Sequence, residues 1–232
     1  MIRTVITLCF SLAVILANGQ TQRYQNRELA LITFNFNIAK DIKPIFDTQS
    51  QLFPEVENRK ADKVIALLKE RTWYLLEARL EQEIGMYILP VNAYGKSFKY
   101  DEYNFPSVSI NQALKRGTSK YYMRVDISII SAIEKKDAGY GASIPANDSI
   151  ASKLSEMENA CLPKITIDIF TYNDKGILPL QKISATITAK DPWVMGEDIF
   201  NGLVNKKEFD RESTNTYLGL TNVAISRLIR NF

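Results

Sequence analysis

A loop that interleaves aromatic and basic residues is the segment of this sequence best suited to bind a ligand. It runs from Lys96 to Phe105. Aromatic rings stack on sugars or on bases, and a lysine ammonium holds an anion. The alternative is that the rings only hold a long loop against the domain. The candidate binding residues of this loop are Phe98, Lys99, Tyr100, Tyr103 and Phe105.

Two carboxylates, Glu77 and Glu81, are four residues apart and so share one face of a predicted helix. Paired carboxylates can bind a cation or carry out acid–base chemistry, as they do in glycosidases. Exposed charges on a helix usually do no more than solvate its surface, and Arg71 and Arg79 are close in sequence. The pair leaves a glycan-acting hydrolase open as an alternative function.

The chain contains no histidine. Its absence excludes Ser-His-Asp and Cys-His catalysis, and it excludes zinc held by histidine. Cys9 and Cys161 are the two cysteines, and Cys9 lies in the N-terminal leader described below. One remaining thiol cannot form an internal disulfide, so the fold must be stabilised by its core. Carboxylate, lysine or tyrosine chemistry, oxygen-ligated cations and the absence of catalysis all stay open, and we assign no catalytic residue, no metal site and no cofactor from the sequence.

Polar residues alternate with aliphatic residues in two predicted strands. Arg124 and Asp126 belong to a strand expected over 121–133, and Thr166 and Asp168 belong to the next strand. Successive side chains of a strand point to opposite faces, so these polar side chains would share one face of a sheet. We expect a docking surface there, with a cross-strand ion pair between Arg124 and Asp168. The alternative is ordinary sheet exterior.

Trp193 follows Asp191-Pro192 at the end of a predicted strand. An exposed tryptophan at such a junction can anchor a partner. Because tryptophan is highly buried on average, burial is the alternative expectation.

The spacing of the apolar residues predicts the elements that would position these candidates. The expected fold class is α+β, with a single mixed or antiparallel sheet of about four to five strands and helices packed on one face. The predicted elements are a strand over 29–36, a helix from about Glu57 to Gly85 with a weak stretch at 72–74, a strand over 86–91, a helix over 108–116, strands over 121–133, 165–172 and 177–189, and a C-terminal helix.

The first nineteen residues have the layout of a secretory signal peptide. Arg3 supplies a positive charge, an apolar run covers Val5–Ala17, and small residues at Ala17 and Gly19 precede Gln20. The run is shorter than the roughly 20 residues that cross a bilayer. Cys9 lies inside the run instead of after it, so lipid attachment is not expected. We expect an exported protein, periplasmic or extracellular, that starts near Gln20; an uncleaved anchor is the alternative.

The rest of the chain is expected to form one domain. The predicted parts are the signal peptide at 1–19, a flexible polar lead-in at 20–28, and a single α+β domain at 29–232 with a long mobile loop near 134–161. The formal charge of +3 falls to +2 without Arg3, and such a balance favours neither a nucleic-acid binder nor an acidic tail. No transmembrane segment is expected after the leader. The oligomeric state stays open.

Three stretches of the chain occur in a familiar order. A long helix runs into a strand over Lys63–Val91, a glycine precedes paired tyrosines in Gly117–Val125, and a hairpin turn reads Tyr172–Gly176. Over residues 29–232 this pattern resembles the amino-terminal domain of TolB, the curli-secretion lipoproteins and the penicillin-binding-protein-activator lipoproteins. The missing lipid-anchor cysteine and the loop at 134–161 depart from it. Those families are non-catalytic envelope proteins, so the resemblance implies an interaction module and transfers no functional residue.

These features predict an exported, non-catalytic protein that binds another envelope protein or an envelope polymer. Two alternatives stay open. A glycan-acting hydrolase needs its two carboxylates in one cleft. A small-ligand carrier needs an enclosed apolar pocket between the sheet and the helices.

Overall fold

The structure of the chain is a computed structural model. It describes residues 23–40, 42–43, 46, 51, 53–55, 60–132, 161–193, 203 and 211–232. The predicted signal peptide and the predicted mobile loop, except for Cys161, lie outside these ranges. Among the described residues, no helix has both the length and the apolar character needed to cross a membrane.

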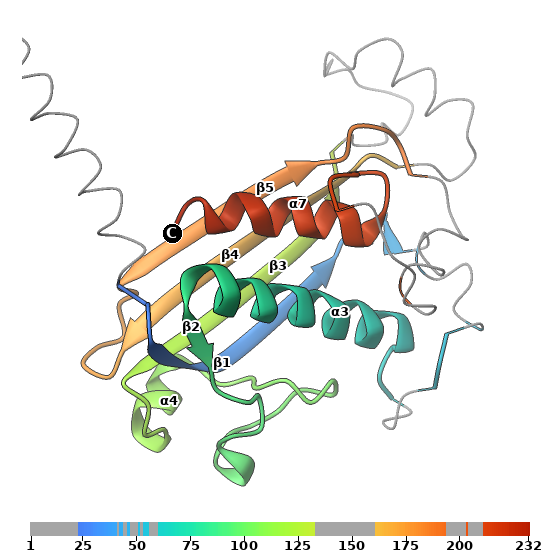
Figure 1. Cartoon of the computed structure of the whole chain (residues 1–232). Coiled ribbons are helices and arrows are strands. Elements are labelled where there is room, and N and C mark those ends of the chain that lie inside the picture. Colours follow the sequence, from blue (N-terminus) through green and yellow to red (C-terminus); the bar gives the residue numbers. More distant parts are fainter. Residues whose placement is uncertain are drawn as a thin grey trace, which may run out of the picture.

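A mixed five-stranded sheet forms the centre of the fold, in the order β2-β1-β3-β4-β5 (Figure 1). β1 is parallel to both of its neighbours, whereas β4 is antiparallel to both β3 and β5. This confirms the predicted α+β class with a mixed sheet. The strands are β1 (Arg27–Ile38), β2 (Met86–Ile88), β3 (Tyr121–Ser131), β4 (Pro163–Asn173) and β5 (Gln181–Thr188).

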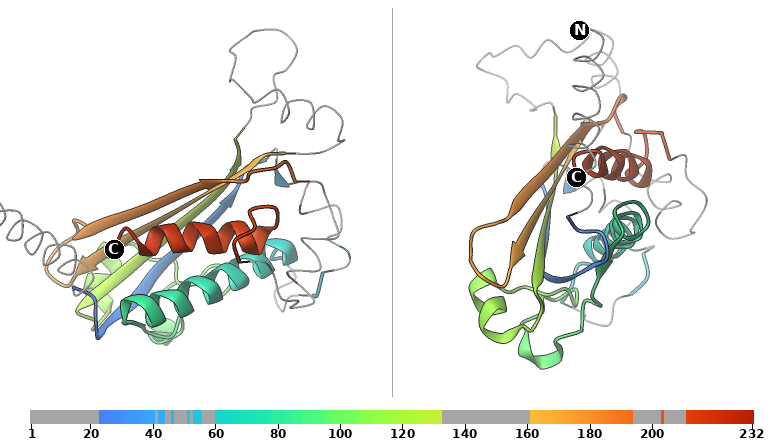
Figure 2. Two further views of the ribbon diagram at one scale, coloured as in Figure 1. Left: turned by 45° about the horizontal axis from the view of Figure 1, so that its top comes forward. Right: turned by 60° about the vertical axis from the view of Figure 1, so that its left-hand side comes forward.

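Two long helices, α3 (Lys63–Arg79) and α7 (Tyr217–Ile229), lie side by side on one face of the sheet (Figures 1 and 2). The short helix α4 (Ile110–Arg116) lies on the opposite face, at the end near β1. The expectation of helices on one face is therefore confirmed for the two long helices. It does not extend to α4.

The boundaries of α3 follow from its capping residues. The Asp62 carboxylate accepts hydrogen bonds from the backbone N–H groups of Val64 and Ile65, at 3.0 and 3.1 Å. The helix continues as one π-helical turn, η2 (Leu80–Ile84), and stops at Gly85, whose φ of 71° is left-handed. The predicted start near Glu57 is too early, because residues 60–62 are not helical and Asp62 caps the helix. The predicted break at 72–74 does not occur, because Thr72 and Trp73 are buried and packed.

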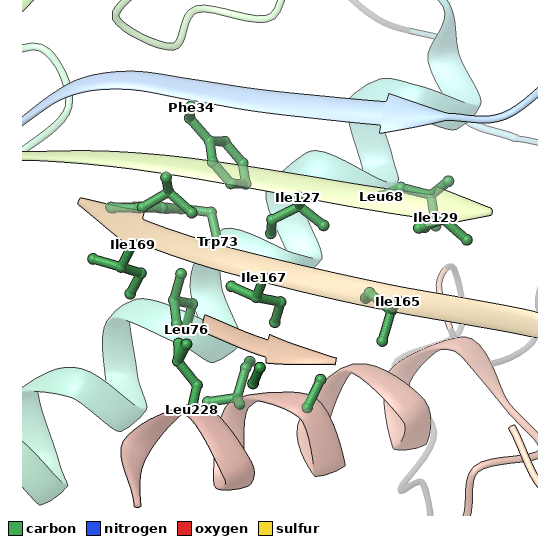
Figure 3. Packing of buried hydrophobic residues seen from close by; sticks show 14 of the residues in the cluster. Phe34, Leu68, Trp73, Leu76, Ile127, Ile129, Ile165, Ile167, Ile169 and Leu228 are labelled. Carbon is green, nitrogen blue, oxygen red and sulfur yellow. The ribbon is translucent and has the colours of Figure 1, made fainter. Parts of the chain in front are cut away.

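The main core lies between the sheet and the two long helices (Figure 3). The register of β3 and β4 places Val125 opposite Ile169, Ile127 opposite Ile167 and Ile129 opposite Ile165. All six side chains are buried on the face that α3 and α7 cover. From the helices, Leu68, Trp73, Leu76 and Leu228 pack onto this layer. The alternation predicted for both strands is thus confirmed.

A second, smaller cluster lies on the other face of the sheet, where α4 and the chain before it cover the β1 end. β1 contributes to both clusters because its side chains alternate between the two faces. Ile32 is an extra residue between Leu31 and Thr33, which pair with consecutive residues of β3, and it shifts this alternation so that Phe34 joins the main core. The buried members of this second cluster are Ala30, Ile32, Phe98, Val108, Ala113, Tyr122 and Tyr172.

The structure corrects the expected flexible lead-in at 20–28 for its described part. Tyr24 is fully buried, and its hydroxyl contacts Thr171 Oγ1 at 2.6 Å and Gln181 Oε1 at 3.0 Å. β1 also begins at Arg27, inside the predicted lead-in. The predicted return strand at 177–189 is shorter as well, because β5 begins only at Gln181.

Side chains occupy backbone carbonyls along both edges of the sheet. Asn231 Nδ2 and Arg227 donate to the carbonyl oxygens of Ser184 and Thr186 on β5, at 2.9 and 3.4 Å. Beyond the end of β2, Lys69 Nζ donates to the Phe34 carbonyl of β1 at 3.2 Å. Occupied edge carbonyls disfavour the addition of a further strand, so a partner is better accommodated on a face of the sheet.

We expect Ile167→Ala to lower the free energy of unfolding by about 2–5 kcal/mol, because it opens a cavity in the main core. Ile130 is the matched control, since it lies on the open face of β3 and is 41% exposed. Ile130→Ala should cost less than about 1 kcal/mol. Urea denaturation followed by circular dichroism measures both values. Equal losses would contradict the described assignment of the two faces.

Candidate functional site

The aromatic loop predicted as a ligand site passes around the edge of β1, and its rings divide between the two faces of the sheet. Phe98 is buried in the second cluster, and Tyr100 packs against that cluster. Phe105 is buried in the main core, with Tyr103 packed beside it. Two hydrogen bonds hold the crossing point, from Val108 N to the Ile32 carbonyl (3.0 Å) and from Thr33 Oγ1 to the Val108 carbonyl (2.7 Å).

The rings of this loop find their partners inside the protein. Phe98 stacks on Tyr94 with ring centroids 4.2 Å apart. Phe105 packs against Phe34 at 4.8 Å and against Trp73 at 6.2 Å. Such contacts occupy the ring faces that a sugar or a base would need. The burial of Phe98 and Phe105 matches the alternative in which the rings hold the loop in place.

The buried ammonium of Lys69 fixes this loop to α3. Its Nζ lies 2.5 Å from Asp101 Oδ2, and it also donates to the β1 carbonyl described above. The second oxygen of Asp101 accepts the backbone N–H groups of Tyr103 and Phe105, both at 2.9 Å. Lys69 Nζ also lies 4.8 Å from the Tyr103 ring centroid and 5.0 Å from that of Phe105. Sequence reasoning missed this residue, because a lysine among helix charges is expected at the surface.

Burial raises the pKa of Tyr103 to about 12, with a further increase from the Glu102 carboxylate beside it. The Tyr103 phenol therefore stays protonated at neutral pH. It acts as a packed ring and offers no base.

We expect Lys69→Met to lower the free energy of unfolding by about 3 kcal/mol, because it leaves the partly buried Asp101 carboxylate without its cation. Lys63→Met is the control on the same helix, since the Lys63 partner Glu55 is largely exposed. That variant should change stability by less than about 0.5 kcal/mol. Chemical denaturation at neutral pH compares the two. A Lys69→Met variant as stable as the Lys63→Met variant would show that the ammonium does not hold the loop.

A surface pocket of about 820 Å³ opens beside the second cluster. The hydroxyl of Tyr100 is buried near it without a hydrogen-bond partner, and burial raises the pKa of this tyrosine. Lys99 is exposed and does not line the pocket. The lining residues are Val91, Asn92, Gly95, Lys96, Phe98, Tyr100 and Asn104.

The polar sheet face brings together the predicted residues Arg124, Asp126 and Asp168. The register places Asp126 directly opposite Asp168, and it places Arg124 opposite Phe170. The expected ion pair between Arg124 and Asp168 is therefore wrong. Arg124 instead pairs with Asp126 on its own strand, with Nη2 to Oδ2 at 2.7 Å and Nε to Oδ1 at 3.0 Å. Asp168 pairs with Lys182 of β5, at 3.5 Å.

These contacts form a row of linked side chains across four strands, which we call the open-face array: Asn35, Arg124, Asp126, Asp168, Phe170 and Lys182. Asn35 Nδ2 donates to Asp126 Oδ1 at 2.7 Å. The Phe170 ring lies between two cations, 5.5 Å from the Arg124 guanidinium carbon and 5.3 Å from Lys182 Nζ. The hydrogen bond from Arg124 to Asp126 is the main cause of the raised Arg124 pKa. The array is thus preorganised on rigid strands.

One acceptor in the open-face array is left without a donor. Asp168 Oδ1 is buried and makes no hydrogen bond, and its carboxylate faces that of Asp126 across the strands. Like charges directly opposite each other destabilise a strand pair. The Lys182 ammonium, 3.5 Å from Asp168 Oδ2, offsets part of this repulsion.

Trp193 is not an exposed anchor. It is buried, and its indole Nε1 donates to the Thr214 carbonyl at 3.0 Å. Its backbone also pairs with Cys161, at the entry to β4. The residue joins the chain before α7 to the sheet, so the structure favours the burial alternative.

The paired carboxylates differ in burial, since Glu77 is half-buried and Glu81 is exposed. Burial raises the pKa of Glu77, and the Glu81 carboxylate raises it further, against a hydrogen bond from Trp73 that lowers it. Glu81 accepts a hydrogen bond from the backbone N–H of Ile88 in β2, at 3.4 Å. Neither carboxylate lines any of the three pockets described for this structure. Within the described ranges, no three acidic or cysteine side chains are placed to hold a metal ion.

A groove of about 990 Å³ beside α7 was not expected from the sequence. Basic side chains line this groove, but two of them already make hydrogen bonds within the protein. Arg79 donates to Asn222 Oδ1 (2.8 Å) and to Ser226 Oγ (3.1 Å), and Arg227 caps β5. The available sequence signal was the pair of arginines at the C-terminal end of α7, Arg227 in its last turn and Arg230 directly after it. The charged lining residues are Arg79, Glu83, Lys190, Arg211, Glu212, Arg227 and Arg230.

Comparisons with known proteins add weak likenesses only. No family model and no curated protein matches the chain. The hypothetical protein CT253 from Chlamydia trachomatis is 11% identical, over 88% of this chain and 92% of that chain, with a TM-score of 0.40. The lipoprotein GNA1162 from Neisseria meningitidis is 10% identical, over 70% of this chain and 82% of that chain, with a TM-score of 0.32. Likenesses this distant carry no conclusion about what this chain does. The resemblance to TolB and the two lipoprotein families stays a prediction.

Proposed function

We propose that this chain is an exported, non-catalytic protein that binds another envelope protein through the open face of its sheet. The observation that carries the proposal is the open-face array, in which charged and aromatic side chains are linked across four strands and left accessible. Arg124 and Lys182 keep 44% and 52% of their side-chain surface exposed. Among the described residues, the chain that covers this face lies only at its β1 end (Figure 2).

The rigidity of the open-face array supports a binding role. Its side chains lie on paired strands, and they are already held by ion pairs, by the Phe170 ring and by the Asn35 amide. Ordering them on association therefore costs little conformational entropy. On an ordinary solvated sheet face, charged side chains are not arranged around an aromatic ring. Here Arg124 and Lys182 both lie against Phe170, which favours a binding surface.

The charge of the array favours a protein over a polyanionic polymer. Arg124 and Lys182 are balanced by Asp126 and Asp168, so the array has no net charge of its own. A polyanion binds best to a surface with an excess of positive charge. Alternating charges around an aromatic ring instead match a protein surface, which can supply charges of both signs.

The two alternative functions find less support. A hydrolase needs both carboxylates in one cleft, and the pockets described above include neither Glu77 nor Glu81. A carrier needs an enclosed apolar pocket between the sheet and the helices. The space there is filled by core side chains (Figure 3), and no buried residue of the main core lines any of those pockets.

A photo-crosslinking amino acid at Ser184 tests the proposal, because Ser184 is exposed and lies opposite Asp168. We expect irradiation of cells to join it to one specific envelope protein, which mass spectrometry identifies. Adding Lys182→Glu should reduce the yield several-fold, because it reverses a charge of the array. Lys115→Glu, on exposed α4, is the matched control and should leave the yield unchanged.

The same crosslinker at Tyr74 reports on the helical side, where this residue is 66% exposed. Equal capture from Ser184 and Tyr74 would contradict docking on the open face. A product that resists protease and is released by a glycan-cleaving enzyme would identify a polymer and reject the protein partner.

A further inference from the structure

The connection between β4 and β5 exposes an unusual amount of apolar surface. Three of the six large hydrophobic side chains that the described part of the chain exposes lie within residues 177–180. They are Ile177 at 53%, Leu178 at 78% and Leu180 at 39% exposure. We call residues 177–180 the apolar tip. Isolated apolar residues on a surface are ordinary, but a contiguous patch at the end of a hairpin marks an interaction site.

The backbone at the base of the apolar tip is fixed while its side chains face solvent. On one side, Asp174 N donates to the Lys120 carbonyl at 3.0 Å, and Lys175 N donates to Asn173 Oδ1 at 3.1 Å. On the other side, Leu180 N donates to the Thr171 carbonyl at 2.8 Å. Backbone hydrogen bonds therefore hold the connection on both sides of the apolar tip, and the apolar side chains take no part in them.

Positive charge surrounds the apolar tip at this end of the sheet. Exposed lysine and arginine side chains lie at the start of the described chain, near the start of β1 and of β3, and before and after the tip in sequence. Against them stand the exposed carboxylates Glu28 and Asp174. The guanidinium carbon of Arg27 also lies 5.8 Å from the ring centroid of Tyr121, so an aromatic ring lies at this end of the sheet as well. The exposed cations of this end are Arg23, Arg27, Lys120, Lys175 and Lys182.

The N-terminal leader joins the domain at this same end. Tyr24 is bonded to Thr171 and Gln181, which lie at the base of the hairpin. Residues 18–22 separate Tyr24 and its neighbour Arg23 from the predicted apolar run Val5–Ala17. A linker of that length spans at most about 20 Å. While the leader is attached to the chain, the apolar tip is thus held close to the membrane that the leader enters.

We propose that this end of the protein docks on an anionic lipid bilayer, with the apolar tip inserted and the surrounding lysine and arginine side chains on the headgroups. Aliphatic side chains gain by entering the acyl boundary, and long cationic side chains reach back to the negative surface. The inference does not depend on the proposed function, since residues 177–180 lie outside the open-face array and Lys182 is the one residue named in both surfaces.

A tryptophan placed at the tip measures its insertion. Both native tryptophans, Trp73 and Trp193, are buried, so their emission supplies a constant background. In the exported protein, Leu178→Trp should shift its emission to shorter wavelength on vesicles of equal parts phosphatidylcholine and phosphatidylglycerol. Brominated acyl chains should quench it. Ile130→Trp, on the open face at the far end of β3, is the control and should show neither effect.

Binding measurements with the same vesicles complete the test. Leu178→Ser should weaken vesicle binding about tenfold or more, and Ile130→Ser should leave it unchanged. Equal quenching at positions 178 and 130, or equal binding to vesicles of phosphatidylcholine alone, would overturn the proposal. A dimer in solution that Leu178→Ser dissociates, without vesicle binding by the parent protein, would assign the tip to a second copy of the chain and also overturn it.

Discussion

Successive side chains of a strand must point to opposite faces of the sheet, and the rest of this structure depends on that constraint in β3 and β4. The ladder that places Ile127 opposite Ile167 in the main core also places Asp126 opposite Asp168 on the other face. A slip of one residue would exchange the two sets and bury the carboxylates. The hydrophobic core and the open-face array are therefore set by one register.

β1 is the strand at which the two faces are connected. Its alternating side chains supply both clusters, and its extra residue, Ile32, shifts the alternation so that Thr33 and Asn35 lie on the polar face. The aromatic loop crosses the edge of this strand, and the ammonium of Lys69 joins the loop, the strand and α3 through Asp101 and the Phe34 carbonyl. The loop thus closes one end of the open face and leaves the β3–β5 part accessible.

The alternation of polar and apolar residues was enough to predict the strands, the fold class and the polar face. It could not predict which residues lie opposite each other, so the Arg124–Asp168 pair was wrong, because periodicity assigns a face but not a register. The burial of Trp193 depends on the distant Thr214 carbonyl, which no local pattern indicates. Residues 177–180 were predicted as the start of a strand because they are mostly apolar, and the local pattern does not show that they are exposed.

Selective thiol labelling tests most directly whether one face of the sheet is open and the other covered. Thr166 and Ile167 are neighbours on β4 that point to opposite faces, and the native Cys161 is buried. We expect Thr166→Cys to react with a maleimide far faster than Ile167→Cys in the folded protein, and the crosslinked partner to protect only the former. Comparable labelling rates for the two variants, with the fold intact by circular dichroism, would contradict an open binding face.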